Sequence, residues 1–124
     1  MFYRGKVHQK IFEGFVDNSA YKYSNKSLAA IYLLSADRIL WRNSKVALER
    51  KNINPELIGL NGLTPYGYTL AKVAQDIVKG TTHLAFADLA DRYLISELTF
   101  ELIITALKIA RSGYDNSGLD KQFM

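Results

Sequence analysis

Residues 96–113 are the stretch that most constrains how this chain can fold. Nine of the thirteen residues from Leu98 to Ala110 are apolar, and the polar residues recur every three or four positions. On a helix of 3.6 residues per turn, this spacing produces one narrow polar stripe and a broad apolar surface that other parts of the chain must cover. We therefore predict a buried central helix at about residues 96–112, capped by Ser96 and ended by Gly113. We expect this stripe to face solvent, although such a stripe can also line a pocket or a partner surface. It consists of Glu97, Glu101, Thr105, Lys108 and Ser112.

Two further segments are expected to pack against this helix. Residues 28–34 carry no charge, so we expect them to be buried in a helix at about 27–36 that Ser27 caps. Periodicity alone does not exclude a buried strand there, but an alanine pair favours the helix. A threonine cap followed by proline predicts another helix at 65–79, which Gly80 ends.

The remaining predicted helices are shorter. Apolar residues recur at helical spacing over residues 5–16, and His8 lies opposite them, where we expect a surface position. Asp37 is expected to cap another helix. That helix either continues to Leu48 or stops at Ser44, where a separate turn begins.

Residues 50–63 are irregular in pattern. Asn54 and Pro55 can open a single helical turn, and Asn61-Gly62 is a turn signal that is also compatible with a small hairpin. Farther along, Thr81 or Thr82 is expected to cap a short helix.

Length and composition favour a single all-α domain of five or six helices. A chain of 124 residues usually forms one core, and we place the domain at residues 1–113, with a flexible tail at 114–124. The chain has no cysteine, which excludes disulfides and thiolate metal sites. It also has no apolar run long enough to span a bilayer and no apolar segment after its charged start. We therefore expect a cytoplasmic protein without a membrane partner.

The charge is uneven along the chain. Residues 1–62 carry ten Lys or Arg against five Asp or Glu, whereas residues 63–124 carry six against seven. Such a basic half can face an acidic partner or can simply be a solvated surface. Aromatic and basic residues, which dominate binding hot spots, also coincide in residues 21–51. The residues that we expect to bind a partner are Tyr21, Tyr23, Arg38, Trp41, Arg42, Lys45, Arg50 and Lys51.

The sequence lacks the common motifs of catalysis. It contains neither a glycine-rich phosphate loop nor a G-x-S-x-G elbow, and it has only two histidines. The best local metal candidate is His83 with Asp88 and Asp91, but acids three residues apart are common on solvated helices. We therefore predict no catalytic residue, no metal and no cofactor. An enzyme with an unrecognised pocket is kept only as a third class of function.

Parts of the sequence resemble an uncharacterised family of small proteins from low-GC Gram-positive bacteria, their phages and mobile elements. The similar residues are Ala71–Gly80, Phe100–Arg111 and, less closely, Ala30–Asp37, together with His8 followed by Phe12. Ser96 and Thr99 depart from the family pattern, which tends to have Asp and Asn there. The resemblance implies a compact helical protein from a mobile genetic element, and because the family has no assigned activity, it offers no catalytic residues to carry over.

Together these features predict a small non-enzymatic interaction protein. Its expected partner is a host protein or nucleoprotein complex, for example one that an anti-defence inhibitor would block. The alternative is a nucleic-acid-binding module that uses the basic N-terminal half, and homo-oligomerisation is a further mode of association that we keep open.

Overall fold

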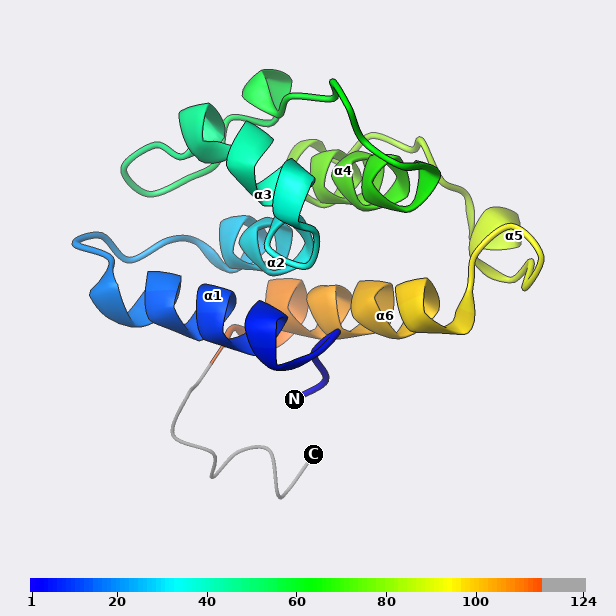
Figure 1. Ribbon diagram of the computed structural model, residues 1–124, viewed down its shortest axis with the longest axis horizontal. Coiled ribbons are helices and arrows are strands. Elements are labelled where there is room, and N and C mark those ends of the chain that lie inside the picture. The colour runs from blue at the N-terminus through cyan, green and yellow to red at the C-terminus, as the bar shows by residue number, and fades with distance from the viewer. Residues whose placement is uncertain (115–124) are drawn as a thin grey trace.

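Six α-helices and two 3₁₀ turns account for the regular structure of residues 1–114, the part of the chain that this computed structural model describes (Figure 1). The prediction of an all-α fold is confirmed: this part of the chain contains no strand, only an isolated antiparallel bridge between Leu48 and Ile53. No helix within it is long and apolar enough to cross a membrane. The elements are α1 (Lys6–Asn18), α2 (Asn25–Leu34), α3 (Arg38–Asn43), η1 (Lys45–Ala47), η2 (Pro55–Leu57), α4 (Pro65–Lys79), α5 (Phe86–Leu89) and α6 (Glu97–Ser112).

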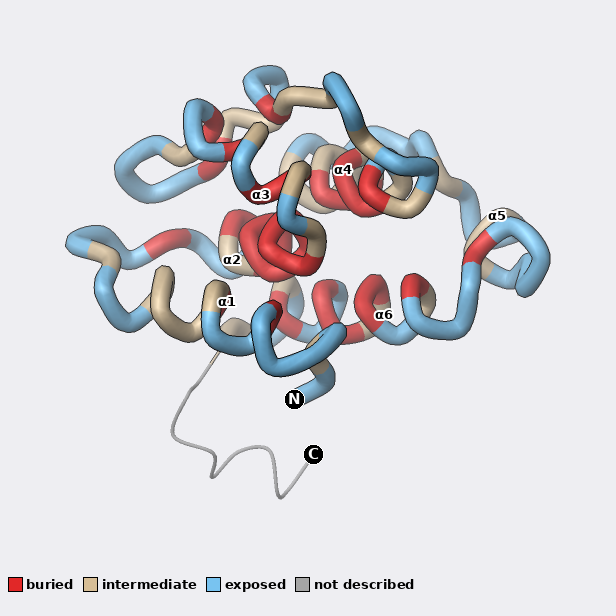
Figure 2. The backbone as a smooth tube through the Cα atoms, in the orientation of Figure 1, coloured by how far each residue is buried: buried red, intermediate tan, exposed pale blue. Residues whose placement is uncertain are grey.

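The centre of the fold is α2 rather than α6. In Figures 1 and 2, α2 runs between α1 and α6 on one side and α3 and α4 on the other, and it packs against both α4 and α6. Seven of its ten residues are buried. The prediction that residues 96–112 form the central helix is therefore corrected, because only one side of α6 is covered. The buried apolar residues of α6 are Leu102, Ile103, Ala106 and Ile109.

The exposed side of α6 also differs from the predicted polar stripe. Thr105, which belongs to that stripe, is buried, and its hydroxyl donates to the Glu101 carbonyl one turn earlier. Leu98 and Leu107 are partly exposed instead. The solvent face of α6 is therefore wider than the stripe and includes two leucines.

Three of the four helix caps predicted for the longer helices and α3 are confirmed. Asp37, Thr64 and Ser96 each accept a hydrogen bond from a backbone N–H in the first turn of the helix that follows. Ser27 is not a cap, because Ser24 takes that role at α2. Ser27 lies buried one turn later, where its hydroxyl accepts a 3.0 Å hydrogen bond from the Ile53 N–H and ties α2 to the irregular segment.

The structure decides between the alternatives that the sequence leaves open for the segments between α2 and α4. The helix that Asp37 caps ends at Asn43, and η1 begins directly after Ser44. Asn54 and Pro55 open η2 as expected. No hairpin forms at Asn61-Gly62; the Asn43 side chain instead donates to the Asn61 carbonyl and holds this turn against α3.

Two further boundaries are corrected. Neither Thr81 nor Thr82 caps α5, because the Asp88 carboxylate accepts from the Ala85 N–H at its start. At the C-terminus, Tyr114 packs edge-on against Phe12 with ring centroids 5.0 Å apart, so this residue belongs to the folded domain. The rest of the tail predicted at 114–124 lies outside the described residues.

A basic groove between α1 and α3

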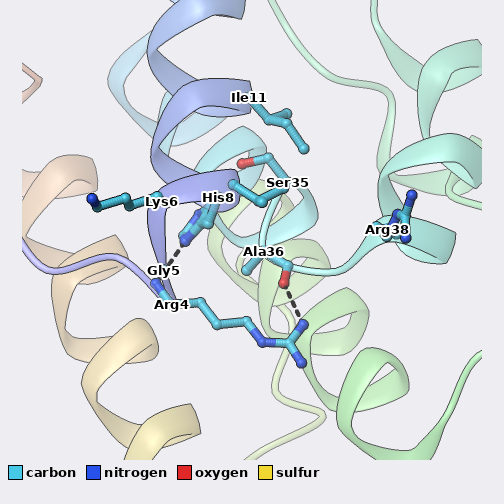
Figure 3. A pocket seen from close by; sticks show the side chains of 9 residues that line it. Arg4, Gly5, Lys6, His8, Ile11, Ser35, Ala36 and Arg38 are labelled. Atoms are coloured by element: carbon cyan, nitrogen blue, oxygen red, sulfur yellow. Dashed lines mark hydrogen bonds between the residues drawn. The ribbon is translucent and has the colours of Figure 1, made fainter.

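Two adjoining depressions lie between the start of α1 and the connection from α2 to α3. They share Arg4, Ile11 and Arg38, and the larger has a volume of about 750 Å³. Figure 3 shows the smaller one, which the N-terminal segment borders on one side and the end of α2 on the other. We call the two together the basic groove, which is lined chiefly by Arg4, Lys6, Ile11, Arg38, Ile39, Trp41, Arg42 and Lys45.

The groove is strongly positive. Five cations line it, against the single carboxylate of Asp37, and that carboxylate already accepts a 2.9 Å hydrogen bond from the Leu40 N–H. Within residues 1–114, none of the five cations forms an ion pair, whereas Lys79 pairs with Glu56 and the His83 imidazole contacts Asp76 elsewhere in the molecule. A concave surface with uncompensated charge of one sign concentrates its field and attracts groups of the opposite sign.

Two of the groove cations are held in place by aromatic rings. The Arg4 guanidinium donates a 2.8 Å hydrogen bond to the Ala36 carbonyl and lies 4.8 Å from the ring centroid of Tyr66. The Lys45 ammonium lies 4.3 Å from the ring centroid of Trp41. Both distances fall within the range of cation–π attraction. A partner that binds these two cations therefore meets side chains that are already partly ordered.

The floor of the groove is apolar. Ile11 and Ile39 are half-buried in it, and Trp41 is only 8% exposed because its ring packs edge-on against Phe15 at 5.5 Å between centroids. On such a surface, the apolar floor can bury the apolar side chains of a partner while the surrounding cations pair with its acidic groups.

His8 lies at the back of the groove and is buried, so the prediction that it is a surface residue is wrong (Figure 3). Its Nδ1 accepts from the Arg4 N–H at 3.0 Å, and its Nε2 donates to the Tyr32 carbonyl at 2.8 Å. These bonds define a neutral imidazole with its proton on Nε2. Burial, with the charge of Arg4 added, lowers the pKa of His8 to about 4 despite the bond to Tyr32.

The prediction for His8 is wrong because α1 buries a different face from the one that its apolar pattern indicates. The apolar pattern of residues 5–16 includes Val7 and Ile11, but the helix turns His8 and Phe12 into the core and leaves Val7 exposed. The two hydrogen bonds of the imidazole make this rotation favourable, since a buried polar group is tolerated when its partners are present.

The structure brings together half of the predicted binding residues. Arg38, Trp41, Arg42 and Lys45 all line the groove. Three of them, Arg38, Arg42 and Lys45, are spaced i, i+4 and i+7, which predicts a common helix face, although Lys45 lies in η1 beyond the end of α3. The sequence pattern did not single out Arg4 and Lys6, because only the path of the N-terminal segment brings them beside α3. Their presence among the cations of the basic half is the one sequence signal that points to them.

The other predicted binding residues lie outside the groove. Arg50 and Lys51 are exposed on the loop after η1. The Arg50 guanidinium lies 5.7 Å from the ring centroid of Tyr21, so these two form a separate contact. Tyr23 is a core residue: it is 8% exposed and packs against Phe15, and burial raises its pKa.

His83, Asp88 and Asp91 do not converge on a common point. The His83 Nδ1 lies 2.6 Å from Asp76 instead, whereas Asp88 and Asp91 accept from the backbone N–H groups of Ala85 and Tyr93. Within residues 1–114, no three potential metal ligands are grouped. These carboxylates therefore hold the local backbone.

Comparison of this chain with protein-family models, with curated proteins and with solved structures finds no match.

Proposed function

We propose that this protein is a non-enzymatic interaction protein that binds an acidic, amphipathic segment of a partner protein in the basic groove. The observation that supports the proposal is the combination of five cations, none of which forms an ion pair within residues 1–114, with an apolar floor of Ile11, Ile39 and Trp41. A segment that alternates acidic and large apolar side chains complements both parts of this surface. Binding and inhibition of a complex require only such complementarity and no chemistry.

Nucleic acid is the competing partner, and the three aromatic residues of the predicted binding set weigh against it. Base stacking requires exposed ring faces, but Trp41 and Tyr23 are buried, and Arg50 lies over the ring of Tyr21. A phosphate backbone also has no apolar group to cover the floor of the groove. The exposed Arg50 and Lys51, outside the groove, are the observation in favour of nucleic acid.

The resemblance to proteins of phages and mobile elements suggests a biological setting for the proposal. A small protein of that origin would act by occupying a surface of a host protein or nucleoprotein complex, such as a defence complex. Its partner would then present an exposed acidic segment with large apolar residues.

A direct test uses defined probes. The first is a labelled 16-residue peptide that alternates Glu with Leu and Phe, and its control replaces each Glu by Gln. We expect the protein to bind the first peptide at least tenfold more tightly than the second, because only the first pairs with the groove cations. Equal affinities for the two peptides would contradict the proposal.

Labelled single- and double-stranded oligonucleotides provide the second arm of the test. Binding to phosphates falls steeply with salt, by roughly one decade of affinity per decade of salt for each phosphate neutralised. We expect weaker binding of the oligonucleotides than of the acidic peptide at physiological salt. Tight oligonucleotide binding with this steep dependence, together with no peptide binding, would establish the nucleic-acid function instead.

A further inference from the structure

A second surface lies at the end of the molecule where Figure 1 shows α5, and its side chains have the opposite character to those of the basic groove. Three large side chains there are uncovered: Phe86 is 89% exposed, Tyr93 94% and Leu94 58%. Carboxylates lie between and beside them in the sequence. We call this region the α5 surface, which consists of Phe86, Asp88, Asp91, Tyr93, Leu94 and Glu97.

The segment that carries the α5 surface is well anchored. The Asp76 carboxylate on α4 accepts hydrogen bonds from the backbone N–H groups of His83 and Leu84 and from the Thr81 hydroxyl. At the other end, the Ile95 N–H donates to the Asp91 carbonyl at 2.9 Å, and the Ile95 side chain is buried in the core. The exposed aromatic side chains are therefore presented by an ordered backbone, which lowers the entropic cost of docking them.

Exposed aromatic residues on an ordered segment call for an explanation. Single exposed apolar side chains are normal, but a cluster of them marks an interaction site in many proteins. Phe and Tyr each bury a large area at an interface, and Tyr is among the residues that dominate binding energy.

The two surfaces of this chain complement each other in charge and polarity. The basic groove has an apolar floor, five cations and one carboxylate. The α5 surface has exposed apolar side chains and three carboxylates, two of which also accept hydrogen bonds from backbone N–H groups, as Asp37 does in the groove. Arg92 is the one cation among residues 86–97, and its guanidinium lies 6.0 Å from the ring centroid of Tyr93. Large apolar side chains that fill the groove would also bring Asp88, Asp91 and Glu97 to its cations.

We propose that the α5 surface of one copy of this protein docks in the basic groove of a second copy. This proposal rests on the proposed function, because it uses the same groove. The ligand that it adds is the α5 surface of another copy of the protein. Because the two contacting surfaces are different, one such contact leaves a free groove on one copy and a free α5 surface on the other. The assembly closes as a dimer if these two also meet, and it otherwise grows into a larger ring or an open chain. Self-association then competes with the acidic partner for the same groove.

The test is complementation between two variants of the full chain, followed by analytical ultracentrifugation. The α5 variant carries Phe86→Ser and Tyr93→Ser, and the groove variant carries Arg38→Glu and Arg42→Glu; all four side chains are exposed. We expect wild-type protein to self-associate as its concentration rises and each variant alone to associate at least tenfold more weakly, as loss of a hot spot predicts. Mixed together, the variants should form a 1:1 heterodimer, since each retains one intact surface.

Matched controls separate the proposed contact from general effects of charge and polarity. Lys26→Glu with Lys108→Glu makes the same change in net charge at exposed positions outside both surfaces, and Leu107→Ser removes an exposed leucine from α6. Both controls should self-associate like wild type.

Two results would overturn the proposal. A groove variant that still dimerises, with no complementation in the mixture, would indicate that two α5 surfaces contact each other instead. A wild-type protein that stays monomeric at all concentrations would show that the two surfaces do not bind. Neither result bears on the proposed function, because the peptide titration measures the groove alone.

Discussion

At the scale of single residues, His8 shows most clearly how this fold differs from its sequence pattern. Its imidazole bridges the N-terminal segment to α2 through the Arg4 N–H and the Tyr32 carbonyl. A charged imidazole would lose the bond that its Nδ1 accepts from Arg4. The neutral ring therefore helps to fix the residues that place Arg4 at the edge of the groove.

The lowered pKa of His8 predicts how stability depends on pH. The unfolded chain takes up this proton near pH 6.5, whereas the folded chain takes it up only at about pH 4. The unfolded state therefore binds more protons between these values, and stability falls as pH decreases through this window. We expect a loss of about 2 kcal/mol in the free energy of unfolding between pH 7 and pH 5.

Urea unfolding of wild type and of His8→Gln at the two pH values measures this effect. Glutamine can accept from the Arg4 N–H and donate to the Tyr32 carbonyl but does not titrate. The variant should therefore lose much less stability than wild type over this range. An equal loss in both proteins would show that His8 is not the group responsible.

At the scale of elements, the sequence predicts where a helix begins and ends better than it predicts how the helices pack. The spans of α4 and α6 follow from residues beside them in the chain, such as Thr64, Gly80 and Ser96. These signals act within one helical turn, so sequence alone reveals them.

Two features could not be predicted in this way: which helix lies at the centre of the fold, and which face of α1 is buried. Residues 28–34 are apolar, and so are nine of the thirteen residues from Leu98 to Ala110, so apolar content alone does not decide which helix is central. The arrangement of the neighbouring helices covers α2 on both sides. For the same reason, helical spacing groups Arg38, Arg42 and Lys45, but it does not place Arg4 beside them.

The central position of α2 predicts unequal costs for two Leu→Ala changes. Leu33 on α2 is fully buried, whereas Leu107 on α6 is 43% exposed. We expect Leu33→Ala to cost about 2–5 kcal/mol of stability because it leaves a cavity in the core. Leu107→Ala should cost less than about 1 kcal/mol. Thermal or urea unfolding measures both, and equal costs would contradict the assignment of α2 as the centre.

The anchoring of the loop before α5 by Asp76 predicts a local effect. Burial alone would raise the pKa of Asp76, but the hydrogen bonds from the His83 backbone, Thr81 and Leu84 lower it overall. Asp76→Ala leaves these donors without their acceptor, and we expect a cost of about 1–3 kcal/mol. Amide hydrogen exchange should accelerate at residues 81–85 and remain unchanged in α2. Unchanged exchange at residues 81–85 would show that other contacts hold this loop.

At the scale of the whole molecule, two surfaces of opposite character lie on one small domain. The basic groove lies between α1 and α3, and the α5 surface lies at the end of the molecule where α5 projects (Figure 1). Cations from the start of the chain, from α3 and from η1 line one groove because the N-terminal segment lies beside the connection between α2 and α3. The fold thus turns a diffuse excess of charge in residues 1–62 into a concave site.

The central claim, that the basic groove binds acidic segments, is tested most directly by exchanging charges between the groove and its ligand. Affinities are measured for wild type and for Arg38→Glu with Arg42→Glu, each with the Glu-containing peptide and with a peptide in which Lys replaces every Glu. Our account predicts that the groove variant binds the acidic peptide at least tenfold more weakly than wild type and gains affinity for the basic one. If the variant binds the acidic peptide as tightly as wild type does, the groove is not the binding site.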